Sequence, residues 1–189
     1  MTLFRTVEPV LEPVTLVEAK AHMRLGHDSE DALIAGLIRA ARDEVERTTG
    51  TALIDQDWRL ALDAWPRSGT VALTPHPVRE ILSVTVYGSE GEASVVDLDA
   101  CRLDPHARPA RLWLADRPAP GAALNGIEVD FRAGYGEAGT DVPDMLKRAI
   151  LMLVAHWFEF RGVAGAADQP VGYPPGYERL VSAFRRARL

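Results

Sequence analysis

The spacing of apolar residues along the sequence changes twice, and this change limits the folds that the chain can adopt. Residues 29–48 and 143–161 place apolar side chains every three to four positions, as on one face of a helix. Residues 51–135 instead alternate apolar and polar side chains, as Trp58 and Leu60 do around a polar neighbour, which is the period of a half-buried strand. The sequence therefore predicts an α+β fold: a small helical bundle, with two long helices plus short ones, that carries an inserted antiparallel β-sheet region.

The start of the first helix has a local signal. Thr15 and Glu18 have the spacing of a capping box, in which the hydroxyl and the carboxylate each accept from an otherwise unpaired amide, and they predict a helix over residues 15–24. Residues 1–13 contain two prolines among scattered apolar residues. We therefore expect them to form an extended N-terminal arm that is not the start of a packed element.

The two long helices have weaker boundary signals. Asp28 or Ser29 can cap the helix of residues 29–48, and Gly50 is its expected stop. For the helix of residues 143–161, Asp141 is the candidate N-cap and Pro143 lies near the first turn, where a missing amide costs little. The domain defined by these helices and the inserted strands is predicted to span residues 14–161.

Between the long helices, turn residues divide the chain into short strands. Val84–Tyr87 and Ser94–Leu98 flank Gly88-Ser89-Glu90-Gly91, which predicts a hairpin with a four-residue loop. Arg111–Leu114 is a further candidate strand, and seven prolines keep the strands short because proline cannot donate to a ladder.

The helix of residues 143–161 has apolar side chains on more than one face. Such a surface must be covered on more than one side, so we expect both long helices to contribute to the core and to a contact with a neighbouring subunit. The predicted core and interface residues are Leu33, Leu37, Val45, Leu146, Ile150, Leu153 and Trp157.

The last 28 residues, 162–189, differ in composition from the rest. A loop rich in Gly, Ala and Pro precedes a short predicted helix, and the C-terminus is basic although the protein is acidic. The residues that give this tail its basic and partly apolar character are Arg179, Leu180, Phe184, Arg185, Arg186 and Arg188. They could contact DNA phosphates or an acidic partner, or be a solvated terminus.

The net charge and the length of the apolar stretches exclude some classes of protein. A net charge of −6 argues against extensive binding to nucleic acid, which normally requires a basic face. The longest strongly apolar stretch, residues 149–158, is too short to cross a bilayer as a helix, which needs about 20 residues. With one cysteine and no N-terminal leader, the chain is expected to be synthesised in the cytoplasm and not to associate with a membrane.

The search for chemistry finds no converging set of reactive residues. His22 and His27 are five positions apart with a glycine between them, whereas helical metal ligands belong three or four apart. His156 lies in an apolar helix, and Cys101 has no basic neighbour in sequence to lower its pKa. We therefore expect no catalytic residue, no metal site and no cofactor, and hence no enzyme.

Several short groups of residues, taken together in their order along the chain, are typical of a known class of proteins. The first is Pro13-Val14-Thr15-Leu16-Val17-Glu18-Ala19-Lys20, with His22, Arg24 and Leu25 and then residues 28–34. The later groups are residues 48–54, Trp58, residues 131–136, Val142-Pro143, and residues 149–151 leading to His156-Trp157. From about residue 13 to residue 161 the chain resembles the head-to-tail connector (adaptor) proteins of long-tailed phages and gene transfer agents.

This resemblance implies a structural role. It implies a homo-oligomeric ring of twelve copies in the neck of a virion or phage-like particle, with the portal protein above and a tail-proximal stopper or tail completion protein below. DNA would pass through the lumen without sequence-specific binding, and the C-terminal tail would reach the portal. The alternatives from the residues alone are a DNA-binding or packaging accessory protein and a small cytoplasmic enzyme.

Overall fold

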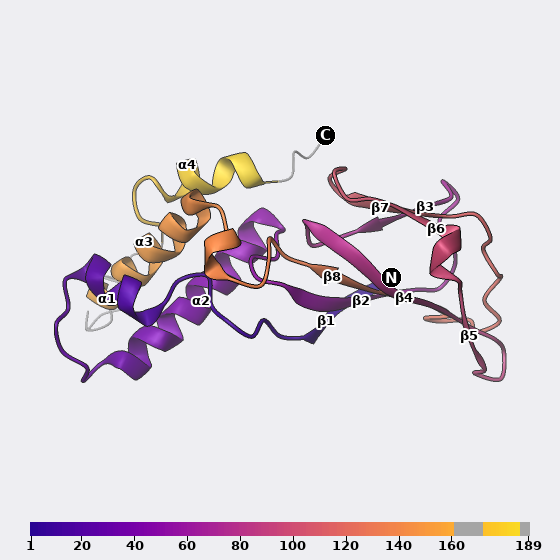
Figure 1. Ribbon diagram of the computed structural model, residues 1–189, viewed down its shortest axis with the longest axis horizontal. Helices are drawn as coiled ribbons and strands as arrows, with labels where there is room; N and C mark the ends of the chain where they lie inside the picture. The colour runs from indigo at the N-terminus through magenta and orange to yellow at the C-terminus, as the bar shows by residue number, and fades with distance from the viewer. Residues whose placement is uncertain (161–171, 186–189) are drawn as a thin grey trace. The chain divides into compact units, whose positions relative to one another are not determined.

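The computed structural model describes residues 1–160 and 172–185, and they fall into two compact units. The β unit comprises Met1–Pro9 and Asp55–Tyr135, and the helical unit comprises Val10–Ile54 and the chain from Gly136 onward. The elements of each unit are labelled in Figure 1. The prediction of a mixed α+β chain, with helices around inserted antiparallel strands, is confirmed.

Within its described residues the helical unit has four helices, of which α2 and α3 are long. They are α1 (Leu16–Met23), α2 (Asp31–Thr49), α3 (Asp144–Phe160) and α4 (Tyr177–Val181), with 3-10 turns η2 (Gly139–Asp141) and η3 (Ser182–Phe184). Helix α3 packs against each of the other three helices. Its covered face contains Leu146, Ala149, Ile150, Leu153, Val154 and Phe158.

The capping box before α1 is confirmed, but the start of α2 differs from the prediction. Neither Asp28 nor Ser29 caps α2, which begins at Asp31. The Asp28 carboxylate accepts from Lys20 Nζ at 2.5 Å, and the Ser29 hydroxyl contacts Nδ1 of His27 at 2.8 Å. Both side chains are thus engaged with other side chains, and the helix starts two residues later than predicted. Its end at Gly50, with φ of 69°, agrees with the prediction.

Asp141 does not cap α3, contrary to expectation. Its carboxylate accepts from the amide of Ala138 at 3.0 Å and so closes the preceding turn η2. Val142 is extended, and the carbonyl of Pro143 accepts from the amide of Leu146 at 2.9 Å. The extended Val142 separates Asp141 from the helix, so Asp141 cannot cap it. Pro143 directly precedes the first helical residue, Asp144.

The β unit contains two antiparallel sheets. A five-stranded sheet has the order β1-β2-β8-β4-β5, and a three-stranded sheet has the order β3-β7-β6. The strands are β1 (Thr2–Val7), β2 (Gln56–Leu62), β3 (Thr70–Leu73), β4 (Val78–Tyr87), β5 (Ala93–Val95), β6 (Cys101–Asp104), β7 (Ala110–Leu114) and β8 (Ile127–Ala133). A 3-10 turn, η1 (Leu98–Ala100), follows β5. The hairpin between β4 and β5 and the strand at β7 form as predicted, but the hairpin loop extends to residue 92, and β5 ends at Val95 and not at Leu98, which lies in η1.

The first residues of the chain differ from their expected state. Residues 2–7 lie in the segment predicted to be an unpacked arm, yet they form β1, which pairs antiparallel with β2 along the edge of the five-stranded sheet. The pairing places Leu3 opposite Leu60 and Arg5 opposite Trp58, with the Arg5 guanidinium 5.3 Å from the centre of the Trp58 ring. A partner strand more than fifty residues away in sequence thus orders this segment.

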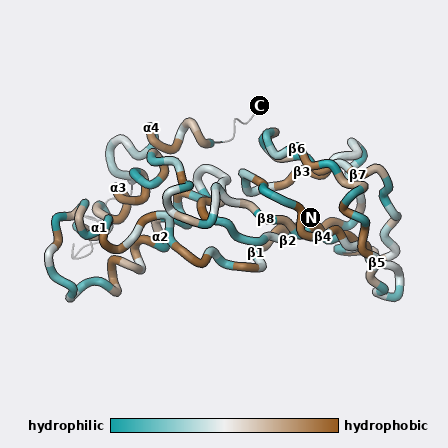
Figure 2. The backbone as a smooth tube through the Cα atoms, viewed as in Figure 1, coloured by the Kyte–Doolittle hydropathy of each residue, from teal (hydrophilic) through white to brown (hydrophobic). Residues whose placement is uncertain are grey.

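One face of the five-stranded sheet is apolar and the other is charged. The central strand β8 alternates buried Ile127, Val129 and Phe131 with half-buried charged residues, and Figure 2 shows the hydropathy along each strand. On the charged face, Arg59 contacts Asp130 at 2.7 Å and Glu128 at 3.0 Å. Cross-strand ion pairs of this kind hold neighbouring strands in register.

The helical unit contains a buried charge network centred on Arg42, a residue of α2 that is 4% exposed. Its guanidinium contacts the carboxylate of Glu12 at 2.9 Å and that of Glu46 at 3.2 Å. Glu46 in turn accepts from the backbone amide of Leu53 at 2.8 Å. The network thus ties α2 to the segment before α1 and to the segment after α2.

We predict that Arg42→Met lowers the free energy of unfolding by about 3 kcal/mol, because it leaves the buried Glu46 carboxylate without its cation. Chemical denaturation measures this loss. The matched control is Arg47→Met on the same helix, which removes an exposed ion pair with Glu44 and should have a much smaller effect. Equal effects of the two substitutions would contradict the assigned role of Arg42.

The ion pair of Asp130 makes the free energy of unfolding depend on pH. Hydrogen bonds from Arg59 hold the pKa of Asp130 below its usual value, against the opposing effect of partial burial. Its contribution to stability is therefore present above the unfolded-state pKa of about 3.9 and is lost as the pH falls through the lower folded-state pKa. Asp130→Asn should cost about 1 kcal/mol at neutral pH and less at pH 3. Denaturation at several pH values tests this, with the exposed Asp116→Asn as control; a constant difference between wild type and Asp130→Asn would contradict it.

Candidate assembly site

The segment that precedes α1 is fixed by the capping box and forms a wall of a groove in the helical unit. The Thr15 amide donates to the Glu18 carboxylate at 2.7 Å, and the Glu18 amide donates to the Thr15 hydroxyl at 3.2 Å. The hydrogen bond from the Thr15 amide, followed by that from its hydroxyl, lowers the pKa of Glu18. The carboxylate is therefore held in its charged form as part of the wall.

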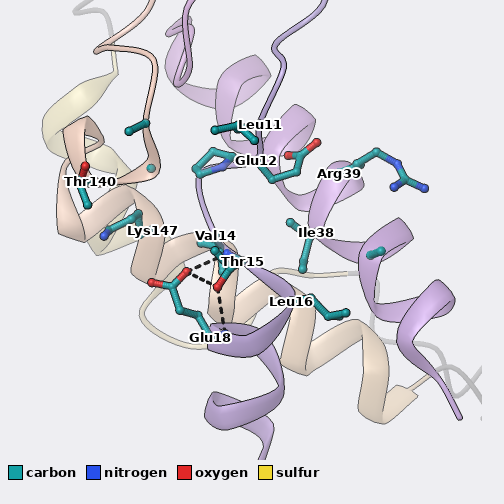
Figure 3. A pocket seen from close by; sticks show the side chains of 14 residues that line it. Leu11, Glu12, Val14, Thr15, Leu16, Glu18, Ile38, Arg39, Thr140 and Lys147 are labelled. Carbon is teal, nitrogen blue, oxygen red and sulfur yellow. Dashed lines mark hydrogen bonds between the residues drawn. The ribbon is translucent and has the colours of Figure 1, made fainter. Parts of the chain in front are cut away.

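The groove has a volume of about 440 Å³ and lies entirely within the helical unit. Val14 and Ile38 are buried residues of its lining, whereas Leu11 is 56% exposed. Figure 3 shows lining residues from the segment before α1, from α1 and α2, and from the region of η2 and α3, with Arg39 and Lys147 on opposite sides of the view. They are Leu11, Glu12, Pro13, Val14, Thr15, Leu16, Glu18, Ala35, Ile38, Arg39, Ala138, Gly139, Thr140 and Lys147.

The charged groups of the groove are not equally available to a partner. Glu12 is bound by Arg42, and Glu18 is held by Thr15. Arg39 is exposed and forms no ion pair with the residues that the structure describes. Lys147 forms an ion pair with the highly exposed Asp144 at 3.4 Å, and its charge also contributes to the lowered pKa of Glu18. The groove therefore presents an apolar lining with two available cations, Arg39 from α2 and Lys147 from α3.

The predicted residues of α2 do not all lie on its buried face. Val45 is buried, but Leu37 is only half-buried and Leu33 is 41% exposed. The face that packs inward instead begins with Ile34 and Ile38, one position further along the helix, or about 100° around its axis. Contact of Leu33 and Leu37 with a neighbouring subunit remains a prediction.

The predicted residues of α3 are brought together in the helical unit. Leu146, Ile150 and Leu153 are fully buried, and Trp157 is half-buried. The wide apolar surface of α3, which the sequence suggested would need a neighbouring subunit, is largely covered by α1, α2 and α4 of the same chain. A contact between subunits must therefore be sought in other exposed features.

The C-terminal segment packs against the helical unit to a greater extent than the sequence indicated. Tyr177 and Val181 of α4 are fully buried, and burial raises the pKa of Tyr177 to about 12. The Tyr177 ring stacks on Tyr173 at 4.5 Å, and the Tyr173 hydroxyl donates to Glu44 of α2. These two tyrosines were missed because a five-residue helix has no clear apolar period.

The residues predicted for the basic tail occupy different environments. Arg179 and Arg185 are exposed, and Arg185 contacts Glu178 at 2.6 Å. Leu180 and Phe184 are half-buried. Arg186 and Arg188 lie outside the described residues.

The side chains considered for chemistry lie apart from one another. His22 is half-buried, and burial lowers its pKa, while burial raises the pKa of the Cys101 thiol. The His156 ring lies edge-on to Phe160 with their centres 4.9 Å apart. Among residues 1–160 and 172–185 there is no group of three His, Cys, Asp or Glu side chains that could hold a metal ion.

Within the same residues, no helix has the length and hydropathy needed to cross a bilayer.

Comparison with known proteins gives matches in sequence and in structure. Residues 13–87 match the model of a family described as phage gp6-like head-tail connector protein. No curated protein sequence matches the chain.

Three chains in solved structures of gene transfer agents have the same fold, each match covering 100% of this chain and 97% of the other. One comes from the neck of an empty particle computed with C6 symmetry, at 28% identity and a TM-score of 0.85. The second comes from the virion of a native particle, at 27% identity and a TM-score of 0.85. The third comes from the neck of a native particle computed with C12 symmetry, at 28% identity and a TM-score of 0.78.

The sequence match includes α1, α2, β2, β3 and β4, and the structural matches extend over the whole length of the chain. Both indicate a structural connector, which supports the expectation that the chain is not an enzyme. The order of motifs noted in the sequence agrees with both findings: residues 13–87 are similar to the phage gp6-like head-tail connector family, and the whole chain shares its fold with chains from gene transfer agent particles.

Proposed function

We propose that the chain is one subunit of a twelve-membered ring in the neck of a phage-like particle. The portal protein would lie above this ring, and a stopper or tail completion protein would lie below it. The observation that carries the proposal is the likeness, over 100% of this chain, to a chain from a gene transfer agent neck. The C12 symmetry used for the neck of a native gene transfer agent particle supports the copy number.

A closed ring with one kind of subunit needs two different patches on each copy, because neighbours are related by rotation and not by a two-fold axis. The exposed and half-buried members of the predicted set, Leu33, Leu37 and Trp157, contribute to one of these patches. Leu33 is the strongest candidate of the three, since a large apolar side chain 41% exposed on a long helix is not explained by the packing of the helical unit.

The C-terminal segment contacts the portal in this proposal. Its arginines Arg179 and Arg185 are exposed, and the sequence continues with Arg186 and Arg188. Arginine forms bidentate hydrogen bonds to carboxylates, so an acidic surface of the portal is the chemistry that this segment fits. Leu180 and Phe184 supply apolar contact beside the arginines.

DNA passes through the lumen of the ring without sequence-specific binding. The net charge of −6 disfavours strong attachment to phosphates. The charged face of the five-stranded sheet also has a negative net charge. Its four carboxylates outnumber its two guanidinium groups; these residues are Asp57, Glu80, Glu128 and Asp130, and Arg59 and Arg132. A surface of this kind lets a polyanion slide past.

The test is assembly of the purified chain on a portal ring from the same particle, followed by electron microscopy. We expect ring density on the tail-facing side of the portal. The double substitution Arg179→Glu with Arg185→Glu should reduce binding at least tenfold, whereas the exposed pair Arg67→Glu with Arg108→Glu should not. Charge substitutions are preferable to truncation after Arg161, because truncation would remove the buried Tyr177 and Val181. A chain that never binds the portal would refute the proposal.

The proposal also predicts the response to DNA. At physiological salt, binding of the free chain to duplex DNA should be undetectable by fluorescence anisotropy. At lower salt, any binding that appears should depend only weakly on the salt concentration. Strong binding that falls steeply with added salt would favour the DNA-binding alternative instead.

A further inference from the structure

We propose that the groove of the helical unit receives the acidic corner of a neighbouring copy of the same chain. The acidic corner is the segment from Val95 to Asp99, which runs from the end of β5 into the turn η1 of the β unit. This inference rests on the proposed function, since it names a specific pair of features, in addition to Leu33, Leu37 and Trp157, that would join one subunit of the ring to the next.

The acidic corner presents apolar and negatively charged side chains together. Val95 is 71% exposed and Leu98 is 38% exposed, which is unusual for aliphatic residues at the edge of a sheet. Asp97 and Asp99 are also exposed, and neither forms an ion pair with the residues that the structure describes. The corner is therefore an apolar knob that carries two carboxylates without an ion-pair partner among the described residues.

The corner is also held in a defined conformation. Between its exposed members, Val96 is buried and its amide donates to the carbonyl of Val84 at 2.8 Å. The Asp97 carboxylate accepts from the amide of Asp99 at 3.0 Å and so caps η1. A knob fixed in this way loses little conformational entropy when it docks.

The groove has the complementary character. Its lining is apolar at Val14 and Ile38, and its two available cations are Arg39 and Lys147. A volume of about 440 Å³ is large enough for the side chains of Leu98 and Val95. Two carboxylates on the corner match two cations at the groove, which orients the knob and disfavours a reversed approach.

The geometry of a ring requires this kind of pairing. The corner belongs to the β unit and the groove to the helical unit, so each copy has one of each and the two patches differ. Such a heterologous contact repeats from copy to copy until rotation closes the ring. A second copy is thus the occupant that matches the apolar surface, the charge and the symmetry of the related necks.

The first test is a charge exchange, with ring formation on the portal as the readout. Arg39→Glu with Lys147→Glu, and separately Asp97→Lys with Asp99→Lys, should each weaken ring formation at least tenfold. A chain that carries all four substitutions should recover most of the loss, because the charges are again complementary. The control exchanges exposed charges elsewhere, Arg67→Glu with Arg108→Glu and Asp116→Lys with Glu137→Lys, and should leave assembly unchanged.

The second test does not depend on charge. In a Cys101→Ala background, a chain with Leu98→Cys is mixed with a chain with Leu11→Cys, and the assembled rings are oxidised. Leu11 lines the groove and Leu98 lies on the corner, so a disulfide between different copies is expected in the mixture. Neither variant alone should form it.

The outcomes separate this inference from the proposed function. If the wild-type chain forms rings on the portal but the charge exchange has no effect and no cross-link appears, the inference is wrong and the proposed function stands. If the wild-type chain forms no ring at all, both are overturned. Recovery in the fourfold variant together with the specific cross-link supports the inference.

Discussion

The buried guanidinium of Arg42 is the constraint on which much of the helical unit depends. A buried charge is tolerated only when it is fully paired, and Arg42 meets this requirement through Glu12 and Glu46, with Glu46 also accepting from the amide of Leu53. These contacts hold the chain just inside two of the three points at which it passes between the units, near residues 10 and 54. They also fix the segment before α1, and hence one wall of the groove.

The parts of the fold that could be predicted are those with signals confined to a few neighbouring residues. The capping box of Thr15 and Glu18, the stop at Gly50 and the hairpin between β4 and β5 are formed by contacts within one turn or one loop. By contrast, β1 could not be recognised, because its order comes from β2, more than fifty residues away. Asp141 was misassigned for a related reason: the sequence pattern does not reveal that Val142 is extended.

The candidate site shows the same division between local and distant information. Leu146, Ile150 and Leu153 were found from helical spacing, but the buried face of α2 contains Ile34 and Ile38, and Leu33 and Leu37 lie outside it. Two adjacent apolar pairs allow either choice, and only the packing partner decides between them. The groove could not be predicted at all, because four separate segments contribute to it. The wide apolar surface of α3 is not evidence for a ring either, because α4 of the same chain packs against part of it.

The central claim is that this chain joins head to tail as a ring subunit, and a reconstruction of the neck of the assembled particle tests it most directly. The account predicts a closed ring of density between the portal and the tail, into each subunit of which both the helical unit and the β unit can be fitted. Absence of the chain from the neck, or its presence there as an isolated copy without rotationally related neighbours, would contradict the account.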